Sequence, residues 1–193
     1  MAEWITVIAT TITACAVLVV WKQIKADHER SRRERSVELV LEWAKSLNPK
    51  ASISRKFAET LSKEDTISLY KQESFSVAEK YKTLLVGCLE AGEQEFTVES
   101  EKIKLTANQV VKIRWEVVSY LNKLEAILSA WRHNIADKDI IEEQFKYLIS
   151  LEDGHELLPE FISVAGNGYP SIKEFAEHLK STLTDKKGKK KVA

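Results

Sequence analysis

The chain has 193 residues, of which 44% are hydrophobic and 30% charged, as is typical of one globular domain. Its 29 basic and 29 acidic residues cancel, so no overall field attracts a polyanion and no nucleic-acid partner is predicted. Cys15 lies in an apolar run and Cys88 in an apolar helical stretch, so a disulfide between them is not expected.

An apolar run without a single charge extends from Trp4 to Trp21. A helix of this length spans roughly 27 Å at about 1.5 Å per residue, which is close to the hydrocarbon thickness of a bilayer. Indole rings favour the headgroup level, so Trp4 and Trp21 mark the two ends of the run. We therefore predict a transmembrane anchor over residues 1–21, with the lipid bilayer as a partner.

Two cleaved forms of this segment compete with the anchor. A secretory signal needs a positive leader, but Glu3 is the only charged side chain ahead of the apolar run. Residues 12–15 fit a lipobox-like pattern ending in Cys15, yet the run stays apolar beyond the cysteine, where a lipoprotein turns polar. Length and flanking residues favour the uncleaved anchor.

Basic residues flank only the C-terminal side of the run. Lys22 and Lys25 follow it, with four arginines over residues 30–35, whereas no Lys or Arg precedes it. The positive-inside rule then predicts a single-pass protein of the inner membrane with a cytoplasmic C-terminal domain. We group Lys22 and Lys25 with the two tryptophans as residues that fix the anchor.

The composition divides the remainder into a basic helical stalk (22–36), a cytoplasmic helical domain (37–184) and a disordered basic tail (185–193). Stalk and tail are rich in Lys and Arg, which suits contact with anionic lipids. One helix is predicted from the membrane to Leu47, where Asn48-Pro49 ends it. At its end, one helical face carries the apolar residues Val37, Val40, Leu41, Ala44 and Leu47.

The domain is predicted to be mainly α, because most of its apolar residues recur at helical spacing. Capping motifs that begin at Ser62, Ser76, Thr106 and Asp137 each predict a helix start, and the helix after Thr106 is expected to be central. Residues 95–105 alternate apolar and polar side chains, which predicts a small β-hairpin or an ordered loop.

No arrangement of residues indicates a familiar catalytic centre. The histidines are not spaced as metal ligands, and there is no Gly-rich phosphate loop, no Gly-x-Ser-x-Gly elbow and no Arg followed four to six residues later by His. We therefore predict no catalytic, cofactor-binding or metal-binding residues and a protein that is not an enzyme.

The densest group of polar residues lies on and just after the central helix: Asn122, Glu125, Arg132, His133 and Asp137. Asn122 and Glu125 share a helical face with apolar residues, which favours a partly buried polar network. One hypothesis makes this network a structural lock. The other makes Glu125, Arg132 and His133 the site of a membrane-tethered enzyme, such as an atypical nuclease.

The pattern Leu121-Asn122-x-x-Glu125, followed by Arg132-His133 and Asp137, resembles a family of bacterial single-pass membrane proteins that share a domain of unknown function. The layout is also similar to that of membrane accessory proteins of RNA-targeting CRISPR systems. This resemblance implies a setting in phage defence. Asn134 stands where we expect a glycine in that pattern, and asparagine tolerates a left-handed turn.

Within the apolar run, Thr6, Thr10 and Thr13 fall on one helical face among small residues. Such a face allows helices to approach closely and hydroxyls to bond across the contact, although threonines also bond to their own helix. We expect a homo-oligomer that acts as an effector or scaffold at the membrane. A ligand sensor is a further hypothesis that the sequence does not separate from this one.

Overall fold

The computed structural model describes residues 2–149 and 157–190, without the side chains of residues 2–12, 14 and 183–190. The mainly helical fold that the sequence predicts is confirmed. The described helices and strands, in chain order, are α1 (Ala2–Ser46), α2 (Pro49–Glu59), α3 (Lys63–Lys71), β1 (Phe75–Ala78), η1 (Glu79–Tyr81), α4 (Lys82–Cys88), η2 (Ala91–Glu93), β2 (Thr97–Glu99), β3 (Lys102–Leu105), α5 (Ala107–Arg132), α6 (Lys138–Phe145), η3 (Lys146–Ile149), α7 (Pro159–Val164) and α8 (Pro170–Lys190).

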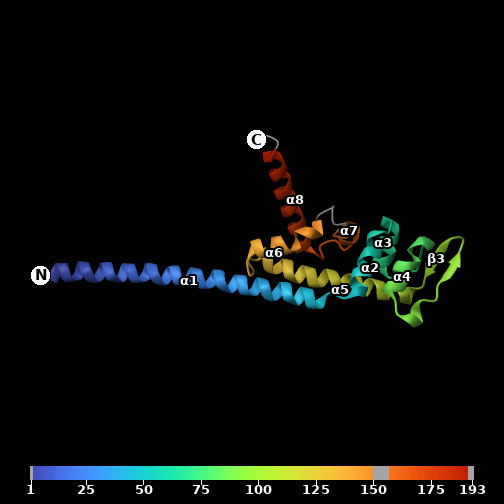
Figure 1. The fold of residues 1–193 in the computed structure, drawn as a ribbon, viewed down its shortest axis with the longest axis horizontal. Coiled ribbons are helices and arrows are strands. Elements are labelled where there is room, and N and C mark those ends of the chain that lie inside the picture. Colours follow the sequence, from blue (N-terminus) through green and yellow to red (C-terminus); the bar gives the residue numbers. More distant parts are fainter. Residues whose placement is uncertain (1, 150–156, 191–193) are drawn as a thin grey trace.

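Helix α1 is one uninterrupted helix of 45 residues. Figure 1 shows its N-terminal part projecting far beyond the remaining elements, whereas its C-terminal part lies beside α5 and α6. The helix ends where Asn48-Pro49 predicts, and the Asn48 side chain caps α2 by accepting the Lys50 N–H at 2.7 Å. The chain between the projecting end and the domain is therefore helical throughout.

No helix is both long enough and apolar enough to cross a membrane among the residues searched, which are the described ones. Most of the predicted span, with Trp4, Thr6 and Thr10, lies outside the described side chains. Thr13 and Trp21 are described, and both are exposed.

The apolar face predicted at the end of α1 is mostly not the face that packs on the domain, since only Val40 of its residues is half-buried against the core. Val37 and Leu41 are 50% and 53% exposed, whereas Ser36, Leu39 and Trp43 are buried. The Trp43 ring packs against the rings of Tyr120 at 5.3 Å and Phe145 at 5.6 Å, measured between centroids. These partners come from α5 and α6, and apolar spacing within α1 does not reveal them.

Helix α5 is central, as predicted. The predicted capping box opens it, because Gln109 N–H donates to Thr106 Oγ1 and Thr106 N–H donates to Gln109 Oε1. Apolar side chains along α5 are fully buried at spacings of three and four residues, and α2 and α8 pack against it. The buried aliphatic residues are Val110, Ile113, Val117, Leu121, Leu124 and Leu128.

Strands β2 and β3 form the predicted hairpin, with Val98 opposite Ile103 and positive φ at Ser100 and Glu101 in its turn. Strand β3 also pairs with β1, which gives the sheet order β1-β3-β2. The predicted helix start at Ser76 is therefore wrong, because that residue lies in β1. Pairing with a distant strand overrides the local capping motif.

The C-terminal end of α8 differs from the prediction. Helix α8 continues to Lys190, so the backbone of residues 185–190 is helical where we expected a disordered tail. Lysine is a good helix former, so the helix continues through this basic segment once α8 has started. Residues 191–193 lie outside the described part of the chain.

Candidate functional site

The turn between α5 and α6 holds α1 on the domain. Asn134 takes the predicted left-handed conformation with φ 56°, which turns the chain at the end of α5. The Asp137 N–H then donates to Ser36 Oγ at 2.7 Å, and that hydroxyl donates to the Arg32 carbonyl at 2.9 Å. Ser36 is fully buried, so the contact is shielded from water. Helix α1 is thus held on the domain by this turn as well as by the packing of Trp43.

The Asp137 side chain has a second role at the same turn. Its Oδ1 accepts the N–H groups of Asp139 at 3.1 Å and Ile140 at 3.3 Å, which caps α6 as the sequence predicts. Its Oδ2 lies 3.5 Å from Arg33 Nε. Asp137 therefore connects the start of α6 to the stalk.

Glu125, on α5, caps the N-terminus of α8. Its two carboxylate oxygens accept the backbone N–H groups of Ser171 at 2.9 Å and Ile172 at 3.0 Å, in the first turn of α8. The first N–H groups of a helix have no partner within it, and its N-terminus carries a partial positive charge. A carboxylate on α5 thus fixes the start of α8.

Further contacts hold α8 along α5 and α6. Arg132 Nε lies 2.6 Å from a Glu174 carboxylate oxygen, and the Trp131 ring meets Phe175 edge-on at 5.1 Å. Glu142 Oε1 accepts the Trp131 indole N–H at 3.0 Å and lies 3.1 Å from His178 Nε2. The C-terminal half of α5 therefore carries α8 on one side and contacts α1 through the following turn.

The five predicted polar residues do not form one network. Glu125 and Arg132 contact α8, Asp137 contacts α1 and α6, and Asn122 and His133 are exposed. The convergence that the nuclease hypothesis predicts for Glu125, Arg132 and His133 is thus not present among these contacts.

Sequence reasoning missed a buried ion pair on α2. Arg55 Nη1 contacts Glu59 Oε1, and both side chains are largely buried. Tyr120 lies near this pair, and burial raises the pKa of its phenol. The available signal was an Arg and a Glu four residues apart in a helix whose apolar face includes Ala51 and Phe57.

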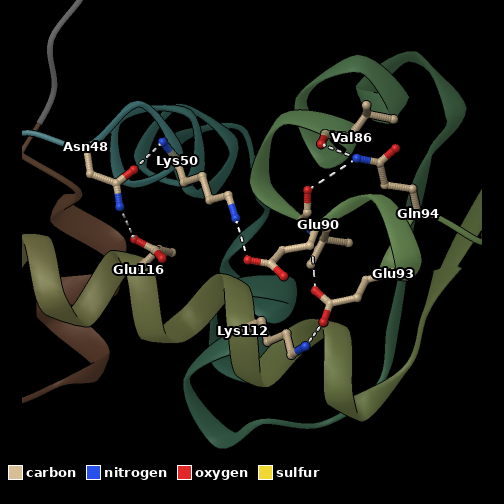
Figure 2. A network of polar contacts seen from close by, with 9 residues as sticks. Asn48, Lys50, Val86, Glu90, Glu93, Gln94, Lys112 and Glu116 are labelled. Carbon is tan, nitrogen blue, oxygen red and sulfur yellow. Dashed lines mark hydrogen bonds and ion pairs between the residues drawn. The ribbon is translucent and has the colours of Figure 1, made fainter.

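A second polar network lies at the surface of the domain. Figure 2 shows Lys50 Nζ pairing with Glu90 at 2.9 Å and Lys112 pairing with Glu93, so that α2, η2 and α5 are linked. The hydrogen bond from Lys50 lowers the pKa of Glu90. Glu90 is well exposed, so we assign this network a positioning role with little effect on stability.

Two cavities lie elsewhere on the domain. One of about 450 Å³ lies between η3, α7 and α8, with Leu148, Ile162 and Ile172 among its lining residues. The other, of about 380 Å³, lies beside η2 and the start of α5. Neither is lined by Glu125, Arg132 or His133. Over the described residues, no three His, Cys, Asp or Glu side chains are grouped as metal ligands.

No protein-family model matches the chain, and comparison with curated proteins and with solved structures gave no match. The resemblance to bacterial single-pass membrane proteins therefore stays a prediction. The candidate site is defined by the structure alone, as the α5–α6 turn with its contacts to α1 and α8.

Proposed function

We propose that this protein is a non-enzymatic, membrane-anchored helical protein that acts as an oligomeric effector or scaffold at the inner membrane. Its domain would lie in the cytoplasm, as the basic stalk favours. A role in phage defence rests on the resemblance of the Leu121–Asp137 pattern alone.

The observation that supports anchoring is a stretch of apolar side chains exposed on all sides of α1. Val17, Leu18, Val19, Val20 and Trp21 are each 51–65% exposed. Five consecutive helical residues point around the whole axis, so a partner helix on one side would leave several of them in water. Burying a Val or Leu side chain stabilises by about 1.5–3 kcal/mol, and lipid surrounds a helix completely.

Continuity of α1 supports a scaffold more than a flexible tether. The helix runs unbroken from this apolar stretch to Trp43, which is buried against the domain. The α5–α6 turn contacts the same helix at Ser36. An anchored domain would therefore be held at a fixed distance and rotation relative to its span.

Fractionation of cells tests the anchor. The full chain should remain in the membrane pellet after alkaline carbonate washing, whereas a chain without residues 2–21 should be soluble. Ile12→Arg places a charge near the centre of the run, at a cost of about 2.5–3.5 kcal/mol, and should release part of the protein. Ile24→Arg, beyond the run, is the matched control and should stay in the pellet. A full chain in the soluble fraction would refute the anchor.

The oligomer is tested separately in detergent. Replacing Thr6, Thr10 and Thr13 together by Leu should leave the domain folded but abolish any higher oligomer that depends on close helix approach. The measurement is the mass of the detergent complex by light scattering on a sizing column. An unchanged mass would show that the threonine face is not the contact between the copies.

A further inference from the structure

The turn between α7 and α8 contains an asparagine followed directly by a glycine, Asn167-Gly168. Both residues are exposed, and they lie after α7 ends at Val164 and before α8 begins at Pro170. Among the contacts of the described residues, the Asn167 side chain makes no hydrogen bond or ion pair. Its amide is therefore open to water and is not held by either helix.

We propose that Asn167 is a site of spontaneous deamidation, a covalent modification that needs only water as co-reactant. The backbone nitrogen of Gly168 loses its proton and attacks Cγ of the Asn167 side chain, since asparagine is a chemically labile residue. The new N–Cγ bond closes a five-membered succinimide ring, and the Cγ–Nδ2 bond breaks to release ammonia. Water then opens the ring at one of its two carbonyls and leaves aspartate or isoaspartate. One water is consumed, one ammonia is released, and nothing is oxidised or reduced.

The glycine selects this asparagine among those of the chain. A side chain on the following residue crowds the attacking nitrogen, and glycine has none. Asn48 precedes a proline, which has no N–H to lose, and Asn134 precedes the β-branched Ile135, whose N–H is already hydrogen-bonded. The other two asparagines lie within the helical backbone of α5 and are Asn108 and Asn122.

One hydrogen bond restrains the attacking nitrogen in the folded turn. The Gly168 N–H donates to the Ala165 carbonyl at 3.2 Å, so the nitrogen must leave this bond before it reaches Asn167. A bond in an exposed turn opens far more readily than the bonds of a buried helix. The fold should therefore slow the reaction without preventing it.

The product changes the turn that leads into α8. Either form replaces a neutral amide by a carboxylate, so the formal net charge of the chain, which is zero, becomes negative. Isoaspartate also adds one backbone methylene between Gly166 and Gly168, beside the carbonyl to which Lys173 Nζ donates. The reaction needs neither a membrane nor a second copy, so it is independent of the proposed function.

Peptide mass spectrometry of the aged full chain tests the site. Trypsin should release residues 147–173, in which Asn167 is the only asparagine. After incubation of the folded chain in detergent at mildly alkaline pH, this peptide should gain the small mass that replacing –NH₂ by –OH produces. The peptide that contains Asn134 is the internal control and should stay unchanged over the same period. No mass gain at Asn167, or an equal gain at Asn134, would overturn the proposal.

Two glycine variants test the attacking nitrogen. Gly168→Ala should slow the mass gain several-fold, because the new methyl group crowds that nitrogen. Gly92→Ala, at a glycine with open space around it, is the matched control and should react like the parent. A Cβ at position 168 would lie 3.3 Å from the Ala165 carbonyl oxygen and so also crowds the folded turn.

The same time course in urea separates the two effects, because the turn is then lost in every chain. The parent should react faster in urea than when folded, and Gly168→Ala should still be several-fold slower than the parent. A Gly168→Ala chain that reacts as fast as the parent in urea would overturn the attack by this nitrogen. A parent rate in urea no higher than the folded rate would overturn the restraint by the turn.

Discussion

Helices α1 and α5 are both long and rich in apolar residues, but they use them in opposite ways. In α5, Leu121 and Leu124 are fully buried, and exposed positions such as Asn122 and Lys123 lie on another side. In α1, the stretch around Leu18 is apolar on every side and exposed. The comparison teaches that the distribution of apolar residues around a helix, more than their number, decides whether one face or the whole circumference needs an apolar environment.

The largest effect is expected from removing the same side chain in the two helices. Leu124→Ala leaves a cavity in the core and should lower the free energy of unfolding by about 2–5 kcal/mol. Leu18→Ala should leave the melting temperature of the domain unchanged, because Leu18 has no place in the domain core. Thermal unfolding of the full chain in detergent, followed by circular dichroism, measures both. Equal destabilisation by the two substitutions would show that Leu18, like Leu124, packs in a folded core.

A smaller effect is expected within α5 itself. Glu125→Ala removes the acceptor for two N–H groups at the start of α8 and should cost about 1–3 kcal/mol. Hydrogen exchange at Ser171 and Ile172 should become faster in the same variant. Asn122→Ala, three residues earlier and exposed, should change stability by less than about 0.5 kcal/mol. Unchanged exchange in α8 would mean that Glu125 does not fix it.

The two cysteines give the smallest expected effect at neutral pH. Cys15 lies in the exposed part of α1, whereas Cys88 is buried at the end of α4. Burial raises the pKa of the Cys88 thiol to about 11 from a usual 9.0. The unfolded thiol ionises first as the pH rises, so the folded protein should lose stability between pH 9 and 11. The slope due to this group is at most about 1.4 kcal/mol per pH unit.

Denaturant unfolding at several pH values measures this slope. The Cys88→Ala variant should show a shallower fall in stability between pH 9 and 11 than the parent chain. Cys15→Ala, in the exposed part of α1, should follow the parent. A Cys88→Ala curve parallel to the parent would show that the buried thiol does not contribute.

Local signals in the sequence predicted the starts of helices well. Thr106, Asp137 and Ser62 cap the helices that they were expected to cap, because a cap depends on residues within one turn. The hairpin at 95–105 was also predictable from its alternation and its short turn. Ser76 is the exception, since its strand partner β3 lies more than twenty residues away.

Contacts between distant elements were not predictable. The sequence identified Glu125 and Asp137 as notable but did not separate them into a cap for α8 and a contact to α1. Ser36 gave no signal, because its partner is the backbone of a turn 101 residues further along the chain. The anchor over residues 1–21 was predicted from the sequence alone and stays a prediction.

The stalk has one more consequence if α1 stands upright in a bilayer. Residues 22–35 separate the apolar run from Ser36, and at about 1.5 Å per residue they raise the domain roughly 21 Å above the lipid. Charges are screened over about 8–10 Å at physiological salt. The core of the domain would then be electrically independent of the membrane surface, and within the stalk lipid charge would act mainly on its first basic residues, Lys22 and Lys25.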